Sequence, residues 1–202
     1  MADRRALALG AAVAAVVAIV ALPATLALTD DHLAGASVAL VLSTVAGALA
    51  VSALALQPLL ARGRRIARHQ ILGSVALCLV LVHVAALFVE SPDDARFALS
   101  PDGPTRARMA LIATIALFGV VALGALRSRL PLSAGTWRVL HAYLAVVVIS
   151  LGIGHAVLTD GALDGAGTVV LIGLGVLGLL GVPAAHAART RRARDRAPSD
   201  EL

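Results

Sequence analysis

Four of the six histidines lie inside or at the ends of long apolar stretches, and they form two equally spaced sets. His69 and His83 are 14 residues apart, and so are His141 and His155. In an α-helix, 14 residues turn through about 1,400°, within roughly 40° of four full turns, and rise about 21 Å. Both members of a set therefore point from one face of their helix, at two depths. Imidazole nitrogen is a common ligand of haem iron and other metals, so all four are candidate metal ligands.

The helices that must position these histidines belong to a strongly apolar chain of 202 residues. Its composition is 59% hydrophobic and its mean hydropathy is +0.92, far above the balance of a soluble domain. Each charge-free stretch is near the roughly 20 residues that a bilayer-spanning helix needs. We therefore expect an all-α integral membrane protein, a six-helix bundle over residues 1–188 followed by a basic cytoplasmic tail at 189–202. The expected spans are 6–28, 33–60, 69–89, 109–126, 139–159 and 165–188.

The distribution of arginine predicts the orientation of these spans. All 17 basic residues are arginine, and 14 of them fall in segments that would share one side of the membrane. The opposite side holds Arg96, Arg106 and Arg108 together with eight of the twelve acidic residues. By the positive-inside rule, both termini are cytoplasmic and the first, third and fifth helices run outward. The basic charge thus reflects topology and contact with anionic lipid, and no nucleic-acid partner is expected.

This orientation predicts how the histidines pair. The third and fifth helices run in the same direction, so His69 and His141 share the cytoplasmic level, while His83 and His155 share the outer level. Two imidazoles that face each other across a helix bundle can occupy both axial positions of a haem iron. The spacing therefore favours two b-type haems, one at each level. The alternatives are histidines that hydrogen-bond between helices, and histidines that carry protons or metal in a transporter or channel.

Two segments around these histidines resemble the ferric reductase-like transmembrane family, which includes ferric reductases and the membrane half of NADPH oxidases. Residues 69–73 read His-Gln-Ile-Leu-Gly, similar to the family's His-Arg-x-Leu-Gly. Residues 137–143 read Trp-Arg-Val-Leu-His-Ala-Tyr, similar to its Trp-x-x-Leu-His-Arg-x-x-Tyr. The resemblance covers about 35–158 and implies haem ligation by the four histidines. Gln70 and Ala142 stand where the family often has a basic residue, so contacts of such residues to haem or flavin are not implied.

The source and destination of the electrons are separate questions. The tail has no glycine-rich nucleotide motif, so the expected donor is a separate cytosolic flavin reductase, a quinol or a loosely held flavin (FMN or FAD). The acceptor is ferric iron, oxygen or a periplasmic enzyme. In the first two cases the chain is itself the oxidoreductase; in the third it is a haem subunit, like the subunit that supplies a periplasmic methionine sulfoxide reductase. No catalytic residue is predicted, and the expected location is a cell membrane, as in the bacterial plasma membrane.

Several other residues are weaker candidates. His32, beside two aspartates, forms either a metal-presenting loop or a helix cap. His186, near the inner end of the last helix, either adjoins the inner cofactor or lies at the membrane interface. Small residues between or beside the histidines are expected to leave room for a flat macrocycle: Gly73, Ala76, Val80, Val148, Gly152 and Gly154.

Overall fold

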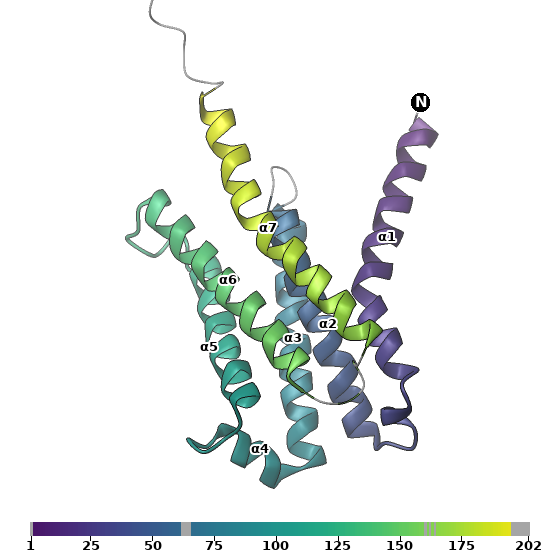
Figure 1. Ribbon diagram of the computed structural model, residues 1–202. Coiled ribbons are helices and arrows are strands. Elements are labelled where there is room, and N and C mark those ends of the chain that lie inside the picture. Colours follow the sequence, from purple (N-terminus) through teal and green to yellow (C-terminus); the bar gives the residue numbers. More distant parts are fainter. Residues whose placement is uncertain (1, 62–65, 160, 162, 164, 195–202) are drawn as a thin grey trace, which may run out of the picture.

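The computed structural model describes residues 2–61, 66–159, 161, 163 and 165–194, and every regular element in that part of the chain is a helix (Figure 1). The elements in chain order are α1 (Ala2–Leu28), the 3₁₀ turn η1 (Asp31–Leu33), α2 (Val38–Leu60), α3 (Ile66–Glu90), α4 (Pro92–Leu99), α5 (Thr105–Ala125), α6 (Ala134–Val157) and α7 (Ala166–Arg194).

Five of the described helices are long and apolar enough to cross a membrane: α2, α3, α5, α6 and the segment Ala166–Pro183 of α7. In α1 the corresponding apolar segment is the shorter Val16–Leu28. Many large apolar side chains on α3, α5, α6 and α7 are exposed on the surface of the bundle, as lipid-facing residues are. The prediction of an all-α protein with several apolar helices that can cross a bilayer is therefore confirmed.

The helix expected from residue 33 begins at Val38. Gly35 adopts a φ of +74°, in the left-handed region that glycine enters without a steric cost. Ser37 then caps α2, because its side chain accepts a hydrogen bond from the backbone N–H of Leu40 at 3.0 Å. The turn and the cap together shift the start of the second long helix by five residues.

A short helix, α4, lies between the third and fourth apolar helices and was not expected from the sequence. Pro92 stands at its first helical position, where the missing N–H has no intrahelical acceptor to lose. Asp93 and Asp94 follow in the first turn, where negative charge favours the helix N-terminus. At eight residues, α4 is too short to span a bilayer and caps one end of the bundle.

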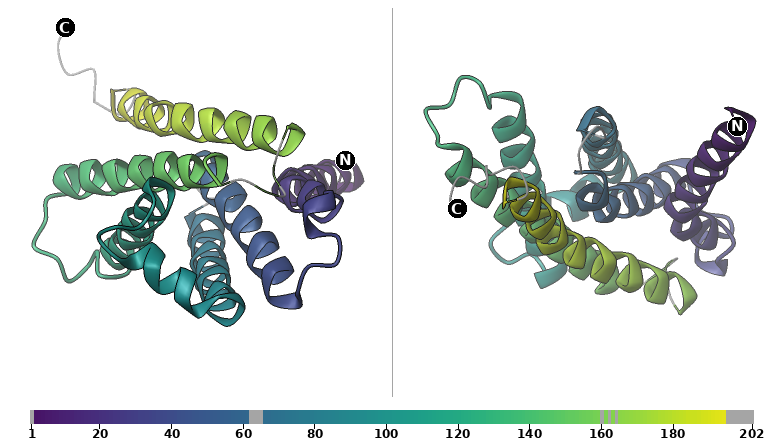
Figure 2. Two further views of the ribbon diagram at one scale, coloured as in Figure 1. Left: turned by 60° about the horizontal axis from the view of Figure 1, so that its bottom comes forward. Right: turned by 90° about the horizontal axis from the view of Figure 1, so that it is seen from above.

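The central helix is α2, which contacts α1, α3, α6 and α7. Figure 2 shows α1 and α5 on opposite sides of it, with α7 running alongside α6. The first residues of α1 and the last residues of α7 lie at the same end of the bundle, whereas η1 and α4 lie at the other end (Figure 1).

The two histidine-bearing helices, α3 and α6, are not a close-packed pair among the described residues. Instead, α3 packs along α2 and α6 packs along α5. The α2–α3 and α5–α6 helix pairs meet through the histidine rings, since those of α3 lie close to those of α6.

Candidate metal centres at two depths of the bundle

The structure brings the four histidines together in the two pairs that the spacing predicts. The ring centroids of His69 and His141 are 6.0 Å apart, with the ring planes tilted by 58°. Those of His83 and His155 are 6.2 Å apart, with the planes at 67°. All four side chains are half-buried. Since 14 helical residues rise about 21 Å, the two pairs lie at clearly different depths.

Backbone carbonyls of α2 hold both histidines of α3. Nδ1 of His83 lies 2.9 Å from the carbonyl oxygen of Ser43, and Nδ1 of His69 lies 3.1 Å from that of Gln57. A carbonyl oxygen only accepts hydrogen bonds, so Nδ1 carries the proton in each ring. Nε2 is then the unprotonated nitrogen, and the neutral imidazole is the form of histidine that binds a metal.

His155 on α6 is held in the same way by α5. Its Nδ1 lies 3.1 Å from the carbonyl oxygen of Arg106, in the first turn of that helix. Three of the four imidazoles thus donate from Nδ1 to a main-chain oxygen of a neighbouring helix.

The supporting residues on α2 were not predicted from the sequence. Ser43 and Gln57 are themselves 14 residues apart, so they repeat the histidine spacing on the adjacent helix. Two polar residues at this spacing in an apolar helix are the sequence feature that could have identified these positions. Gly47 belongs to the same face, because a Cβ there would lie 2.9 Å from Nδ1 of His83. Only glycine lets the His83 ring approach α2 this closely.

The remaining histidine, His141, lies against an aromatic ring. The indole of Trp137 stacks on it, with centroids 4.9 Å apart and planes inclined by 21°. The indole N–H donates a 2.9 Å hydrogen bond to the carbonyl oxygen of Leu123, in the last turn of α5, where helical carbonyls lack an intrahelical donor. The Arg127 guanidinium lies 5.4 Å from the indole centroid on the α5–α6 connection. Trp137 thereby links the orientation of His141 to α5.

An apolar cluster includes residues of α3 and α6 that lie between the two histidines of each helix. It is built on Ala116, Leu117 and Val148, which are almost fully buried. Partly buried side chains from α2, α3, α5 and α6 pack around it: Leu54, Leu77, Val80, Val120, Val121, Leu144 and Val147. This cluster separates the two pairs with hydrocarbon.

The small residues expected to leave room for a macrocycle have several different neighbours. Ala76 and Val148 are buried, and Val80 joins the apolar cluster. Gly152 faces Val51 of α2. Beside Gly154 lies the side chain of Met109, and beside Gly73 lies the carboxamide of Gln57. The space next to these two glycines is therefore taken by protein side chains.

The ring separation in both pairs matches that of a bis-imidazole iron site. Metal–imidazole bonds are about 2.0–2.1 Å and the ligating nitrogen lies about 1 Å from the ring centroid, so centroids of opposed rings should be about 6 Å apart. The observed 6.0 and 6.2 Å agree with this value. Among the described residues there is no group of three or more His, Cys, Asp or Glu side chains that could hold a metal ion. A porphyrin supplies four nitrogens of its own, which complements two protein ligands.

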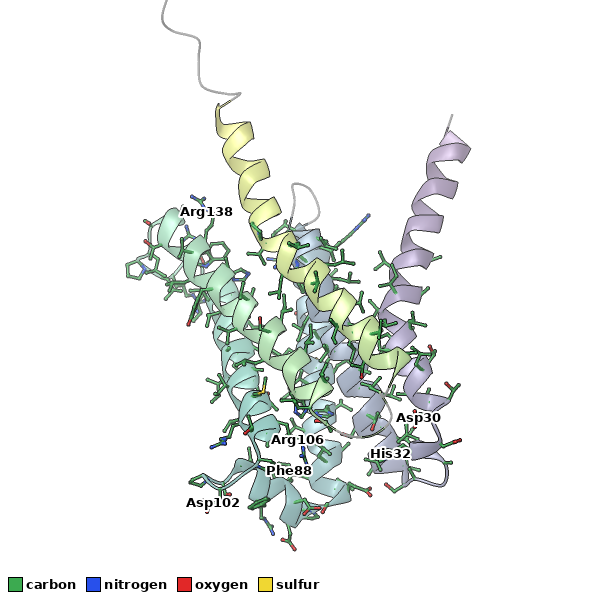
Figure 3. All side chains as sticks on the ribbon, viewed as in Figure 1. Asp30, His32, Phe88, Asp102, Arg106 and Arg138 are labelled. Carbon is green, nitrogen blue, oxygen red and sulfur yellow. The ribbon has the colours of Figure 1, made fainter. Side chains whose placement is uncertain are left out.

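The other candidate residues are distributed over the ends of the bundle. Asp30 accepts a 2.8 Å hydrogen bond from the backbone N–H of His32, so it acts as the cap of η1. Figure 3 shows Asp30, His32 and Asp102 at one end and Arg138 at the other. The side chain of His186 lies outside the described residues.

No protein-family model, curated protein or solved structure matches the chain.

Proposed function

We propose that this protein transfers electrons across a membrane through two b-type haems, from a cytoplasmic or membrane donor to an extracytoplasmic acceptor. The observation that carries the proposal is the pair of facing imidazole sets, at 6.0 and 6.2 Å, on one pair of helices. The resemblance of residues 69–73 and 137–143 to the ferric reductase-like family supports the same assignment.

The protein residues would hold and orient the cofactors. His69 and His141 would supply Nε2 to the iron of the inner haem, and His83 and His155 to that of the outer haem. The carbonyl oxygens that accept from Nδ1 fix the tautomer and raise the basicity of the ligands. When bound, haem supplies reversible one-electron chemistry. Each electron delivered outside would convert one ferric ion to ferrous ion, with one electron taken from the donor.

The topology belongs to the same proposal. With α1 as a sixth span, both termini are cytoplasmic and α3 and α6 run outward. The arginine distribution supports this orientation, since Arg138 is at the opposite end of the bundle from the acidic residues Asp30 and Asp102 (Figure 3). The inner pair is then the entry level for electrons from a flavin reductase or a quinol. The outer pair is the exit level, toward ferric iron, oxygen or a periplasmic enzyme.

The direct test is a pyridine-haemochrome assay on detergent-purified protein. We expect about two haems b per chain, both low-spin because two histidine imidazoles would ligate each iron. A preparation of folded protein from haem-sufficient cells that contains no haem would rule out the proposal. A stoichiometry of one would rule out the two-site version.

A further inference from the structure

Gln57 is buried, with 8% of its surface exposed, in the last turn of α2. Neither its side-chain nitrogen nor its side-chain oxygen has a hydrogen-bond partner among the described residues. Burying an amide without a partner is unfavourable, and buried polar groups in folded proteins nearly always have one. The carboxamide of Gln57 is therefore available to a group that binds there.

Gln57 differs in this respect from the other polar residues that are classed as buried. In the described part of the chain they are Ser43 and Ser52. The Ser43 hydroxyl donates to the carbonyl oxygen of His83 at 3.2 Å, and the Ser52 hydroxyl donates to that of Ala48 at 2.8 Å. Both serines are satisfied by protein groups, whereas the larger carboxamide of Gln57 is not.

The carboxamide lies beside the inner histidine pair. The backbone carbonyl of Gln57 is the group that accepts from Nδ1 of His69. Its side-chain nitrogen would lie 3.3 Å from a Cβ at Gly73, which is one helical turn beyond His69 on the same face of α3. The absence of a side chain at residue 73 thus leaves room for the carboxamide on the histidine-bearing face.

We propose that the Gln57 side chain donates a hydrogen bond from Nε2 to an oxygen acceptor of the group bound at the inner histidine pair. This inference rests on the proposed function. Two acceptors have the required chemistry: a carboxylate of the inner haem, and an oxygen of a quinone or quinol donor. A hydrogen bond to the carboxylate would offset its negative charge and so favour the reduced inner haem, whereas a hydrogen bond to a quinol oxygen would hold the electron donor at this level.

The test is a spectroscopic redox titration of the purified protein with both haems bound. Gln57→Met keeps the side-chain volume and removes the donor, and Ser52→Ala is the matched control, because it removes a buried hydroxyl that bonds within α2. We expect Gln57→Met to disfavour reduction of the inner haem by up to about tenfold, which is 59 mV for one electron. The outer haem and the Ser52→Ala protein should titrate like wild type. Gln57→Asn, whose amide is shorter, should shift the inner haem in the same direction.

Extraction of quinone separates the two acceptors. A shift that persists in quinone-free protein assigns the haem carboxylate. An unchanged potential combined with a several-fold higher KM for quinol assigns the quinone. If both variants match wild type in inner-haem potential and in quinol KM, the inference is wrong. In that case a wild-type content of two haems would leave the proposed function standing, whereas haem-free wild-type protein would contradict the proposed function itself.

Discussion

The inner and outer histidine pairs have nearly the same separation, but the protein supports them differently. At the outer level, His83 and His155 both donate to main-chain carbonyls, of Ser43 and Arg106. At the inner level, His69 donates to a main-chain carbonyl while His141 stacks on the indole of Trp137. A hydrogen bond to a main-chain carbonyl is retained after most side-chain substitutions, whereas a contact with an aromatic ring is lost when that residue is replaced. Loss of a supporting side chain should therefore have a larger effect at the inner level, at Trp137, than at the outer level, at Ser43.

The largest effect is expected from the loss of a proposed iron ligand, which on the proposed function should affect entry and exit of electrons separately. In oriented vesicles, His83→Ala or His155→Ala should still allow reduction of the inner haem by an internal donor, but should abolish reduction of external ferric iron. His69→Ala or His141→Ala should block entry from the internal donor. Equal loss of both steps in all four variants would contradict the division into two levels.

A smaller effect, confined to the outer level, is expected from Gly47→Ala. The added methyl group would lie 2.9 Å from Nδ1 of His83, so the ring or α2 must shift. Overpacking of this kind typically costs about 1–3 kcal/mol. Haem content measured during mild thermal challenge should show earlier loss of the outer haem only. Gly124→Ala is the control, since a Cβ there meets no atom within 4 Å. Similar behaviour of both variants would show that the contact at Gly47 does not hold His83.

Removal of the indole should affect the inner level. Trp137→Ala deletes the ring that stacks on His141 and the donor to Leu123, and aromatic pairs contribute about 0.5–1.5 kcal/mol beyond their buried area. We expect earlier thermal loss of the inner haem and a broadened inner-haem electron paramagnetic resonance signal. Trp137→Phe retains an aromatic ring and should restore most of the stability. A change in the outer-haem signal instead would show that Trp137 supports the outer level, which would contradict its assignment to the inner level.

The smallest effect is expected from Ser43→Ala. The substitution removes the hydroxyl but leaves the carbonyl oxygen that accepts from His83. A hydrogen bond contributes about 0.5–1.5 kcal/mol, so retention of the outer haem should fall only slightly, by less than in Gly47→Ala. A complete loss of the outer haem in Ser43→Ala would mean that the hydroxyl, and not the main chain, holds the ring.

The histidine pairs could be predicted from the sequence because helix periodicity fixes both the face and the depth of residues 14 apart. The supports of the rings could not, since three of them are carbonyl oxygens and a carbonyl has no sequence signature. The positions of Ser43 and Gln57 became meaningful only once α2 was seen to pack along α3. The sequence pattern identified the candidate ligands, and the tertiary arrangement identified the groups that orient them.

The elements of the fold also divide into those that the sequence predicts and those that it does not. Long apolar runs identify membrane helices by composition alone, whereas α4 and the delayed start of α2 depend on local capping at Pro92 and Ser37. The neighbours of Gly73 and Gly154 could not be predicted either. Side chains from other helices, Gln57 and Met109, fill these positions, and residues on a separate helix cannot be anticipated from the spacing within one segment.

The most direct test of the two-level account is the assignment of haems in the four single histidine-to-alanine variants by absorbance spectra and haem stoichiometry. The account predicts that His69→Ala and His141→Ala lose the same haem, and that His83→Ala and His155→Ala lose the other, each variant keeping about one haem per chain. If His83→Ala and His141→Ala removed the same haem, the pairing seen in the structure would not be the pairing of iron ligands.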